Sequence, residues 1–476
     1  MSLVLTLLLA TTTLQTKPRF EVTQAFLDAA VATARPAVER ELGYALGEGF
    51  AGARLATSAE IRDALVQENE PIMAAQLRDQ ELGRKQAQAF AQALAPLLLA
   101  KYAGLEHAVL VSAEELRAKA ELLELPELES AEVLSAILVH ELVHAADVPR
   151  YDFYGSCARL ADSDRILALN AVLEGHAQHV ARRVCAELGN AAGFETFTRA
   201  ITAEVPATEE EGEGVHLLRR MQSSTFDGMY VGGERFIAAV EAKAARDGIA
   251  RAFREPPRDM AEIQRPEWYL DPALRPVTHL ELERALDAFA AEYTERSWPA
   301  QRLSLDAGQL ALAFAGFEDA AVERIRAALV RGRLLKVDAP DLSAMHYGLA
   351  CEWASSAEAN FVLQASKILL KRRDEDLKQG AIRILEARYE PVAEEGLTGV
   401  YGRKRLSSFG QEFEIATAVL ADGPLTLELL RSGEPGTREE LLALARRMLA
   451  AARVPEEPPP PAERPRSGGT GGSDGG

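Results

Sequence analysis

The 476-residue sequence has little cysteine and no excess of positive charge, and each shortage excludes a class of protein. Three cysteines are too few for a disulfide framework, and the odd number leaves at least one of them unpaired. The formal net charge is −19, so most of the surface repels phosphate groups. We therefore expect no nucleic acid and no anionic membrane surface as a partner.

Long apolar runs are also lacking, and we predict no transmembrane segment, because a spanning helix needs about 20 apolar residues. The apolar run at residues 3–10 is too short to span a bilayer and is followed by a threonine-rich stretch. This pattern resembles the hydrophobic part of a secretory signal peptide, so we predict a signal peptide at residues 1–17 and export to the periplasm or the extracellular space. The alternative is a frayed N-terminus on a cytoplasmic protein.

Histidine is scarce as well, yet two of the eight histidines form an H-E-x-x-H motif in an apolar run free of proline. At 3.6 residues per helical turn, His140 and His144 lie on one face, where two imidazole nitrogens can bind one cation. Glu141 beside them can accept a proton from the attacking water as a general base. The motif therefore predicts a metal site, and the alternative is a pair of histidines satisfied by ordinary hydrogen bonds.

A catalytic zinc needs a third protein ligand, and the downstream sequence limits the choice. The metzincin pattern requires a glycine and a further histidine, but Asp147 and Arg150 occupy those positions. Glu174 follows His144 by thirty residues, in a second segment with helical periodicity. That spacing leaves room for a loop and a returning helix, so Glu174 can complete a site with two histidines and one glutamate.

Two further histidines compete with Glu174 for the ligand role. On one continuous helix, His176 and His179 point about 200° and about 140° away from Glu174, so only one of the three can face the metal. Asn170 and Gln178 lie one turn on either side of Glu174, where they could orient its carboxylate. We read Asp147 as an acceptor for a ligand imidazole, as a partner of a nearby arginine, or as an ordinary surface residue.

The arrangement resembles the gluzincin peptidases, in which H-E-x-x-H is followed on a second helix by a glutamate ligand in the sequence E-G-x-A. The resemblance implies zinc as the cofactor, with His140, His144 and Glu174 as its ligands. It also implies that Glu141 is the general base and that Gly175 allows the helices to pack closely.

A second element of the resemblance concerns the oxyanion that forms during peptide hydrolysis. Gluzincins commonly stabilise it with a tyrosine or histidine from another segment. Tyr230, Gly233 and Phe236 match a Y-x-x-G-x-x-F element found downstream of the glutamate ligand in several bacterial gluzincin-like families. The resemblance thus implies a catalytic role for Tyr230.

The chain is long enough for two domains and tails. We predict a mainly helical α+β fold, with a zincin-like catalytic domain at 18–297 and a short strand at 107–111 beside the motif helix. A helical C-terminal domain is predicted at 298–453, and the proline- and glycine-rich residues 454–476 are predicted to be disordered. The helices expected in the C-terminal domain are 309–315, 320–331, 356–372 and 438–453.

The sequence thus predicts a zinc metallopeptidase that hydrolyses bonds in a peptide or protein substrate. One alternative keeps Zn²⁺ but acts on a different amide. The other alternative is a helical scaffold or interaction protein in which the motif is incidental.

Overall fold

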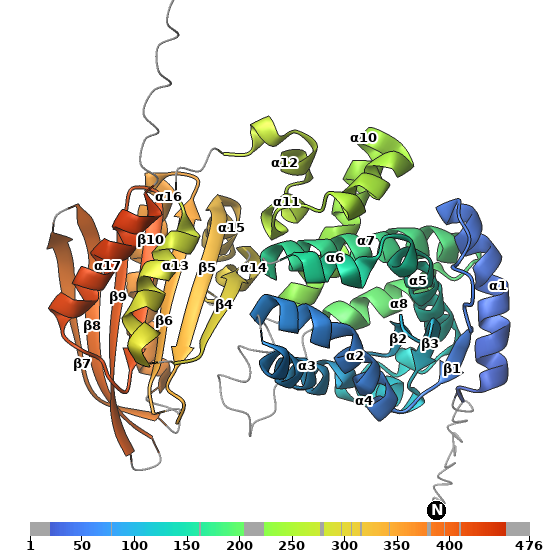
Figure 1. Cartoon of the computed structure of the whole chain (residues 1–476), viewed down its shortest axis with the longest axis horizontal. Coiled ribbons are helices and arrows are strands. Elements are labelled where there is room, and N and C mark those ends of the chain that lie inside the picture. Colours follow the sequence, from blue (N-terminus) through green and yellow to red (C-terminus); the bar gives the residue numbers. More distant parts are fainter. Residues whose placement is uncertain are drawn as a thin grey trace, which may run out of the picture. The chain divides into compact units, whose positions relative to one another are not determined.

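The computed structural model consists of two units, which comprise Met1–Pro276 with Leu303–Gly332, and Val277–Arg302 with Arg333–Gly476 (Figure 1). The structure describes residues 20–77, 79–160, 163–203, 223–276, 280–296, 298–305, 307–314, 317–341, 343–377, 382–394, 396–408 and 411–453. The predicted signal peptide at 1–17 and the predicted disordered tail at 454–476 lie outside these ranges.

The first unit is mainly helical and contains one small sheet. Its strands are β1 (Ala53–Leu55), β2 (Ala100–Ala103) and β3 (Ala108–Val111). The order is β1-β3-β2, with β1 parallel and β2 antiparallel to β3, so β3 is the central strand and β2 is an edge. The prediction of a strand at 107–111 is confirmed.

The helices of the first unit include the motif helix α5. They are α1 (Gln24–Leu42), α2 (Ser58–Leu77), α3 (Gln80–Leu94), α4 (Ala113–Leu122), α5 (Ala131–Arg150), α6 (Phe153–Arg159), α7 (Ser163–Glu187), α8 (Ala191–Thr202), α10 (Gly233–Arg254), α11 (Met260–Gln264), α12 (Pro266–Leu270), α14 (Ala307–Leu312) and α15 (Asp319–Ala328). Short 3₁₀ turns lie at Ala95–Leu97, Pro126–Leu128 and Pro272–Leu274, and a π-helical turn, η3, spans Gly228–Gly232.

Helix α5 begins where local chemistry favours a helix and then passes through the core. The Ser130 hydroxyl accepts a hydrogen bond from the Val133 amide, and Glu132 lies in the first turn, where a negative charge suits the helix dipole. Nearly every residue from Val133 to Val148 is buried. A helix that is buried on all sides is stable only when other elements enclose it, and α1, α7, α8 and β2 do so here.

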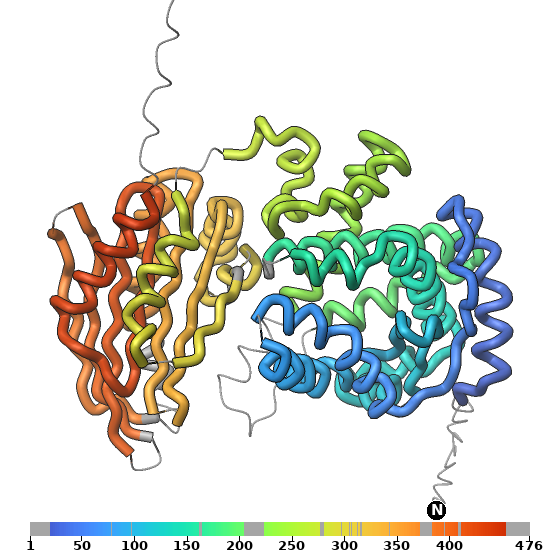
Figure 2. The backbone as a smooth tube through the Cα atoms, in the orientation of Figure 1, coloured from blue at the N-terminus to red at the C-terminus, as the bar shows by residue number. Residues whose placement is uncertain are grey.

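A seven-stranded sheet with the order β4-β5-β6-β10-β9-β8-β7 lies mainly in the second unit (Figure 2), although residues 303–305 of β4 and 329–332 of β5 fall in the first. Strands β7 to β10 form an antiparallel meander, and β10 also pairs antiparallel with β6. The strands are β4 (Ala300–Leu305), β5 (Leu329–Asp338), β6 (Met345–Trp353), β7 (Ile382–Glu394), β8 (Leu397–Ser408), β9 (Gln411–Asp422) and β10 (Leu425–Ser432).

Helices cover both faces of this sheet. Ala418 and Leu420 of β9 join a core with α13 (Leu282–Ala290) and α17 (Arg438–Ala452). Val419, between them in the strand, packs instead with Leu363 of α16 (Ser356–Leu377). Because successive side chains of a strand point to opposite faces, α13 and α17 lie on one side of the sheet and α16 on the other. A 3₁₀ segment at Ala291–Arg296 follows α13.

The prediction of a helical C-terminal domain at 298–453 is wrong, although α14, α15, α16 and α17 overlap the four expected helices. Strand β9 contains several alanine residues and strand β10 several leucine residues, and both residue types favour helices in isolation. In the folded chain, pairing with neighbouring strands and burial on the sheet outweigh that local preference. The mixed, mainly helical α+β character of the whole chain is confirmed.

None of the helices described between residues 20 and 453 combines the length and apolar character that crossing a membrane requires.

Close packing between α7 and the start of α10 depends on two glycines. A Cβ atom on Gly175 would overlap the backbone of Gly233, and a Cβ on Gly233 would overlap the Ala171 carbonyl oxygen. The contact explains why small residues stand at both positions, as expected for Gly175. It also fixes the place of η3, which runs directly into α10 at Gly233.

We predict that Gly175→Ala destabilises the first unit by about 1–3 kcal/mol, because the added methyl group forces α7 and α10 apart. Gly228→Ala is the matched control on η3, since its Cβ would meet only the flexible end of Met260, at 3.4 Å. Urea unfolding of both variants measures the difference. Equal stability of the two variants would contradict the packing argument.

Candidate metal centre

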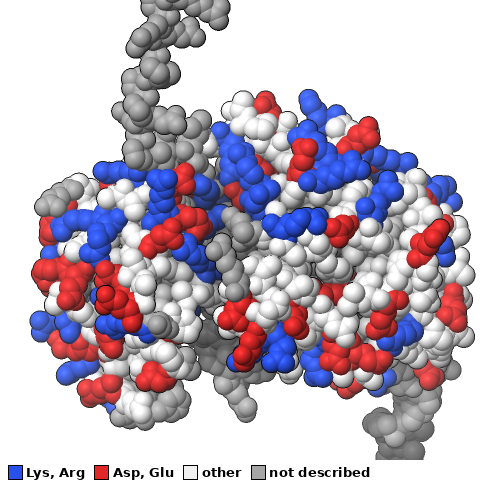
Figure 3. Space-filling view, viewed as in Figure 1, with Lys and Arg blue, Asp and Glu red and all other residues white. Residues whose placement is uncertain are grey.

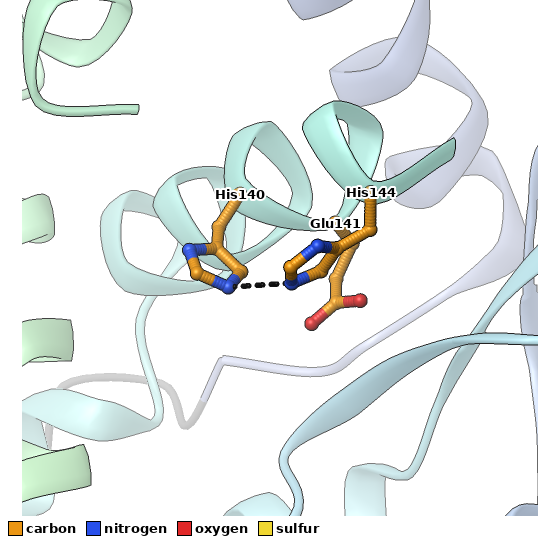
Figure 4. Close-up of side chains that lie close together, drawn as sticks. All are labelled: His140, Glu141 and His144. Atoms are coloured by element: carbon orange, nitrogen blue, oxygen red, sulfur yellow. Dashed lines mark hydrogen bonds between the residues drawn. The ribbon is translucent and has the colours of Figure 1, made fainter. Parts of the chain in front are cut away.

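Helix α5 presents both histidines of the motif to one point (Figure 4). His140 is 1% exposed, His144 is 7% exposed, and Glu141 between them is 8% exposed. One potential ligand atom from each of these three residues lies within 4.8 Å of the others. The three residues therefore form a buried group that can hold a metal ion.

Glu174 of α7 reaches the same point, as its position in a returning helix predicts. The Nε2 atoms of His140 and His144 are 2.9 Å apart, and Glu174 Oε2 lies 3.2 Å and 3.3 Å from them. In a tetrahedral zinc site with bonds of about 2.0–2.1 Å, neighbouring ligand atoms are about 3.3 Å apart. The triangle formed by the two nitrogens and this oxygen thus has the size of one face of such a site.

Glu141 and Glu174 are both available as a third ligand, but their carboxylates have different surroundings. The Tyr102 backbone amide donates a hydrogen bond of 2.6 Å to Glu141 Oε2, which ties this carboxylate to strand β2. Glu174 instead directs one oxygen at both imidazoles. Two imidazole nitrogens and a carboxylate oxygen suit zinc, and Glu141 is left beside the centre.

The charges of the centre depend on one another. Burial alone would raise the pKa of Glu174, but His144 and His140 beside it bring that pKa well below its ordinary value. Burial alone would lower the pKa of His144, but the Glu174 carboxylate outweighs burial and raises it. The Glu174 side chain is only 18% exposed, so its carboxylate requires positive charge next to it, which a divalent cation would supply.

The other histidines of α7 have carboxylate partners of their own. His176 Nδ1 lies 2.6 Å from Asp147 Oδ2, and His179 Nε2 lies 2.9 Å from Glu241 Oε2 on α10. Neither is therefore placed to replace Glu174 beside the motif histidines.

Asp147 does not take any of the roles that the sequence suggested for it. It is fully buried and accepts a hydrogen bond from the Tyr44 hydroxyl in addition to its contact with His176. The Asp147–His176 pair joins α5, which carries the two motif histidines, to α7, which carries Glu174. The Asn170 amide donates to the Ile166 carbonyl oxygen at 2.8 Å and is engaged there rather than with Glu174.

Tyr230 lies against the motif, as the resemblance implies. Its ring stacks on His140 with 5.7 Å between the ring centroids and 23° between the planes. Burial, the charges of Glu174 and Glu141, and a hydrogen bond to Glu174 raise the pKa of Tyr230 well above its ordinary value. The hydroxyl therefore stays protonated and can donate a hydrogen bond throughout the physiological pH range.

Strand β2 forms one wall of the centre, and its polar contacts could not be predicted from the sequence. The Gly104 amide donates to Glu68 Oε1 of α2 at 2.7 Å, and Glu68 Oε2 lies 2.6 Å from Lys101 Nζ. Lys101 Nζ also donates to the Tyr102 carbonyl oxygen at 3.0 Å. Glu68 precedes Lys101 by 33 residues, so no local pattern in the sequence links the two.

The centre opens into a cleft of about 500 Å³. Its lining contains the motif residues, Glu174 and Tyr230, together with many apolar side chains from α2, α3, α6, α7 and α8. A cleft of this volume is in the range that binds small molecules or several residues of a peptide.

Neither protein-family models nor curated proteins yield a match to this chain. One solved structure with some similarity is a crystal structure from Chloroflexus aurantiacus described as "a putative hydrolase with a novel fold". The two sequences are 18% identical, and the match covers 54% of this chain and 94% of the other, with a TM-score of 0.37. That TM-score does not establish a common fold. The interpretation of the centre therefore depends on its own geometry.

We predict that the purified protein binds about one zinc ion per chain and that Glu174→Ala weakens this binding at least about tenfold, because one of three ligand atoms is lost. Elemental analysis combined with competition by a chelator measures the affinity. Glu187→Ala, an exposed change on the same helix, should leave the affinity unchanged.

Retention of tight binding in Glu174→Ala, with loss of zinc in Glu141→Ala, would show instead that Glu141 is the third ligand.

Proposed function

We propose that this protein is a zinc-dependent hydrolase of peptide bonds, similar in mechanism to the gluzincins. The observation that carries the proposal is the convergence of His140 Nε2, His144 Nε2 and Glu174 Oε2 within 3.3 Å of one another, beside Glu141 and at the floor of a cleft. If the motif were incidental on a scaffold protein, nothing would require a second helix to bring a carboxylate to these two nitrogens.

Zinc held by these three residues would polarise the scissile carbonyl group and make water more acidic. Glu141 takes a proton from the water molecule whose oxygen attacks the carbonyl carbon. The same proton passes from Glu141 to the amide nitrogen as the carbon–nitrogen bond breaks, so the products are a carboxylic acid and an amine. The Tyr102 amide holds the Glu141 carboxylate in position for both transfers.

Tyr230 supplies a hydrogen bond to the oxyanion that develops on the carbonyl oxygen. The position of Tyr230 supports this role, because its ring stacks on His140 and the residue lines the cleft. Before the reaction the hydroxyl is hydrogen-bonded to Glu174, and it turns to the oxyanion only as that charge develops, so its main effect is on kcat.

Hydrolysis of a compact amide, rather than of a polypeptide, is the second candidate. The observation that favours it is on the outer edge of β2, where the side chains of Lys101 and Glu141 bind both backbone groups of Tyr102. An extended peptide that paired with this edge would have to displace them.

We predict that Glu141→Gln keeps zinc but lowers the hydrolysis of an unstructured protein such as casein at least about a hundredfold, because the amide side chain cannot accept the proton. Glu132→Gln, an exposed change at the start of the same helix, should keep both zinc and activity. Turnover by Glu141→Gln close to that of the wild type would contradict the role of Glu141.

We predict that Tyr230→Phe lowers kcat about a hundredfold with a smaller change in KM, because the hydroxyl acts mainly in the transition state. Its phenyl ring can still stack on His140, so zinc content should not change. Steady-state kinetics on a single peptide give both constants. A change confined to KM would show that Tyr230 binds substrate without stabilising the oxyanion.

A further inference from the structure

The cleft extends beyond the metal centre into an apolar chamber between α5 and the helical pair α2–α3. Leu65, Ile72 and Met73 of α2 and Phe90 and Leu94 of α3 line this chamber. Helix α2 is fixed to strand β2 through Glu68, so the chamber wall is attached to the same strand that positions Glu141. The chamber is therefore structurally connected to the metal centre.

Charges within the cleft are compensated, in contrast to the many exposed charges of both signs on the face in Figure 3. Lys101 and Glu68 form an ion pair, with their side chains 14% and 2% exposed. The charges of Glu174 and Glu141 together would balance a divalent cation held at the histidines. A charged substrate side chain in the chamber would lose its hydration and, among the described residues that line the cleft, meet no charge that is not already paired.

The outer edge of β2 offers few free backbone groups near the centre. The Tyr102 amide is bound by Glu141, the Tyr102 carbonyl oxygen by Lys101, and the Gly104 amide by Glu68. Pairing of a substrate strand along this edge would break several of these buried contacts. Burial of an apolar substrate group in the chamber would leave these contacts intact.

From these three features we infer that the substrate places a bulky, uncharged apolar group in the chamber, next to the bond that is cleaved. Recognition arises from burial of this group rather than from backbone pairing with β2. The inference rests on the proposed hydrolase function and names its class of substrate.

The first test compares short peptides that differ in one residue next to the scissile bond. Leucine or phenylalanine should give a kcat/KM at least about tenfold higher than aspartate or lysine, as expected for burial of one apolar side chain. N-methylation of backbone amides away from the scissile bond should change kcat/KM less than threefold. Equal cleavage of charged and apolar peptides, or a large loss on N-methylation, would overturn the inference.

A second test uses binding, so that it does not depend on turnover. Phe90 and Leu82 both lie on α3 and are 39% and 42% exposed, but only Phe90 is among the residues that line the cleft. In the zinc-loaded Glu141→Gln protein, Phe90→Lys should weaken binding of the neutral apolar dye Nile red at least about tenfold. Leu82→Lys should leave it unchanged, and equal effects of the two changes would overturn the inference.

The two tests separate this inference from the proposed function. Loss of dye binding in Phe90→Lys, without cleavage of any peptide by the wild type, would support the chamber's ligand class and overturn the proposed peptidase function. Cleavage of charged and apolar peptides at equal rates would support the proposed peptidase function and overturn the inference about the chamber's ligand class.

Discussion

Two imidazoles and a carboxylate lie against one another inside an apolar core, and the rest of the first unit depends on making that arrangement stable. Burial of Glu174 without a positive neighbour would cost several kcal/mol. His140 and His144 meet this requirement only if α5 and α7 keep a fixed separation. The buried Asp147–His176 contact joins the two helices directly, and the packing of Gly175 against Gly233 sets the distance to the segment that carries Tyr230.

The same apolar helices account for the character of the cleft. Helices α7 and α8 and strand β2 enclose α5 and also contribute residues to the walls of the cleft, which α2, α3 and α6 complete. Polar contacts are therefore concentrated at a few positions. Glu68, Lys101 and the Tyr102 backbone bind one another or Glu141, which fixes strand β2 and leaves apolar surface for a ligand.

The sequence could predict α5, α7 and β3 because each shows a clear period or a motif with fixed spacing. It could also predict that Glu174 approaches the motif, because thirty residues after His144 leave room for a loop and for a helix that returns alongside α5. The sheet of the second unit was missed, since alanine and leucine in β9 favour a helix until neighbouring strands bury them. The link from Tyr44 through Asp147 to His176 connects residues far apart in the chain, and no local pattern indicates it.

The most direct test of the metal centre is a crystal structure of the zinc-loaded protein with data collected at the zinc absorption edge. The account predicts one anomalous peak about 2.0–2.2 Å from His140 Nε2, His144 Nε2 and a Glu174 oxygen, with Glu141 adjacent but not bound to the metal. A peak coordinated by Glu141 in place of Glu174 would contradict the assignment of ligand and base. The absence of any peak at the histidines would contradict the metal centre itself.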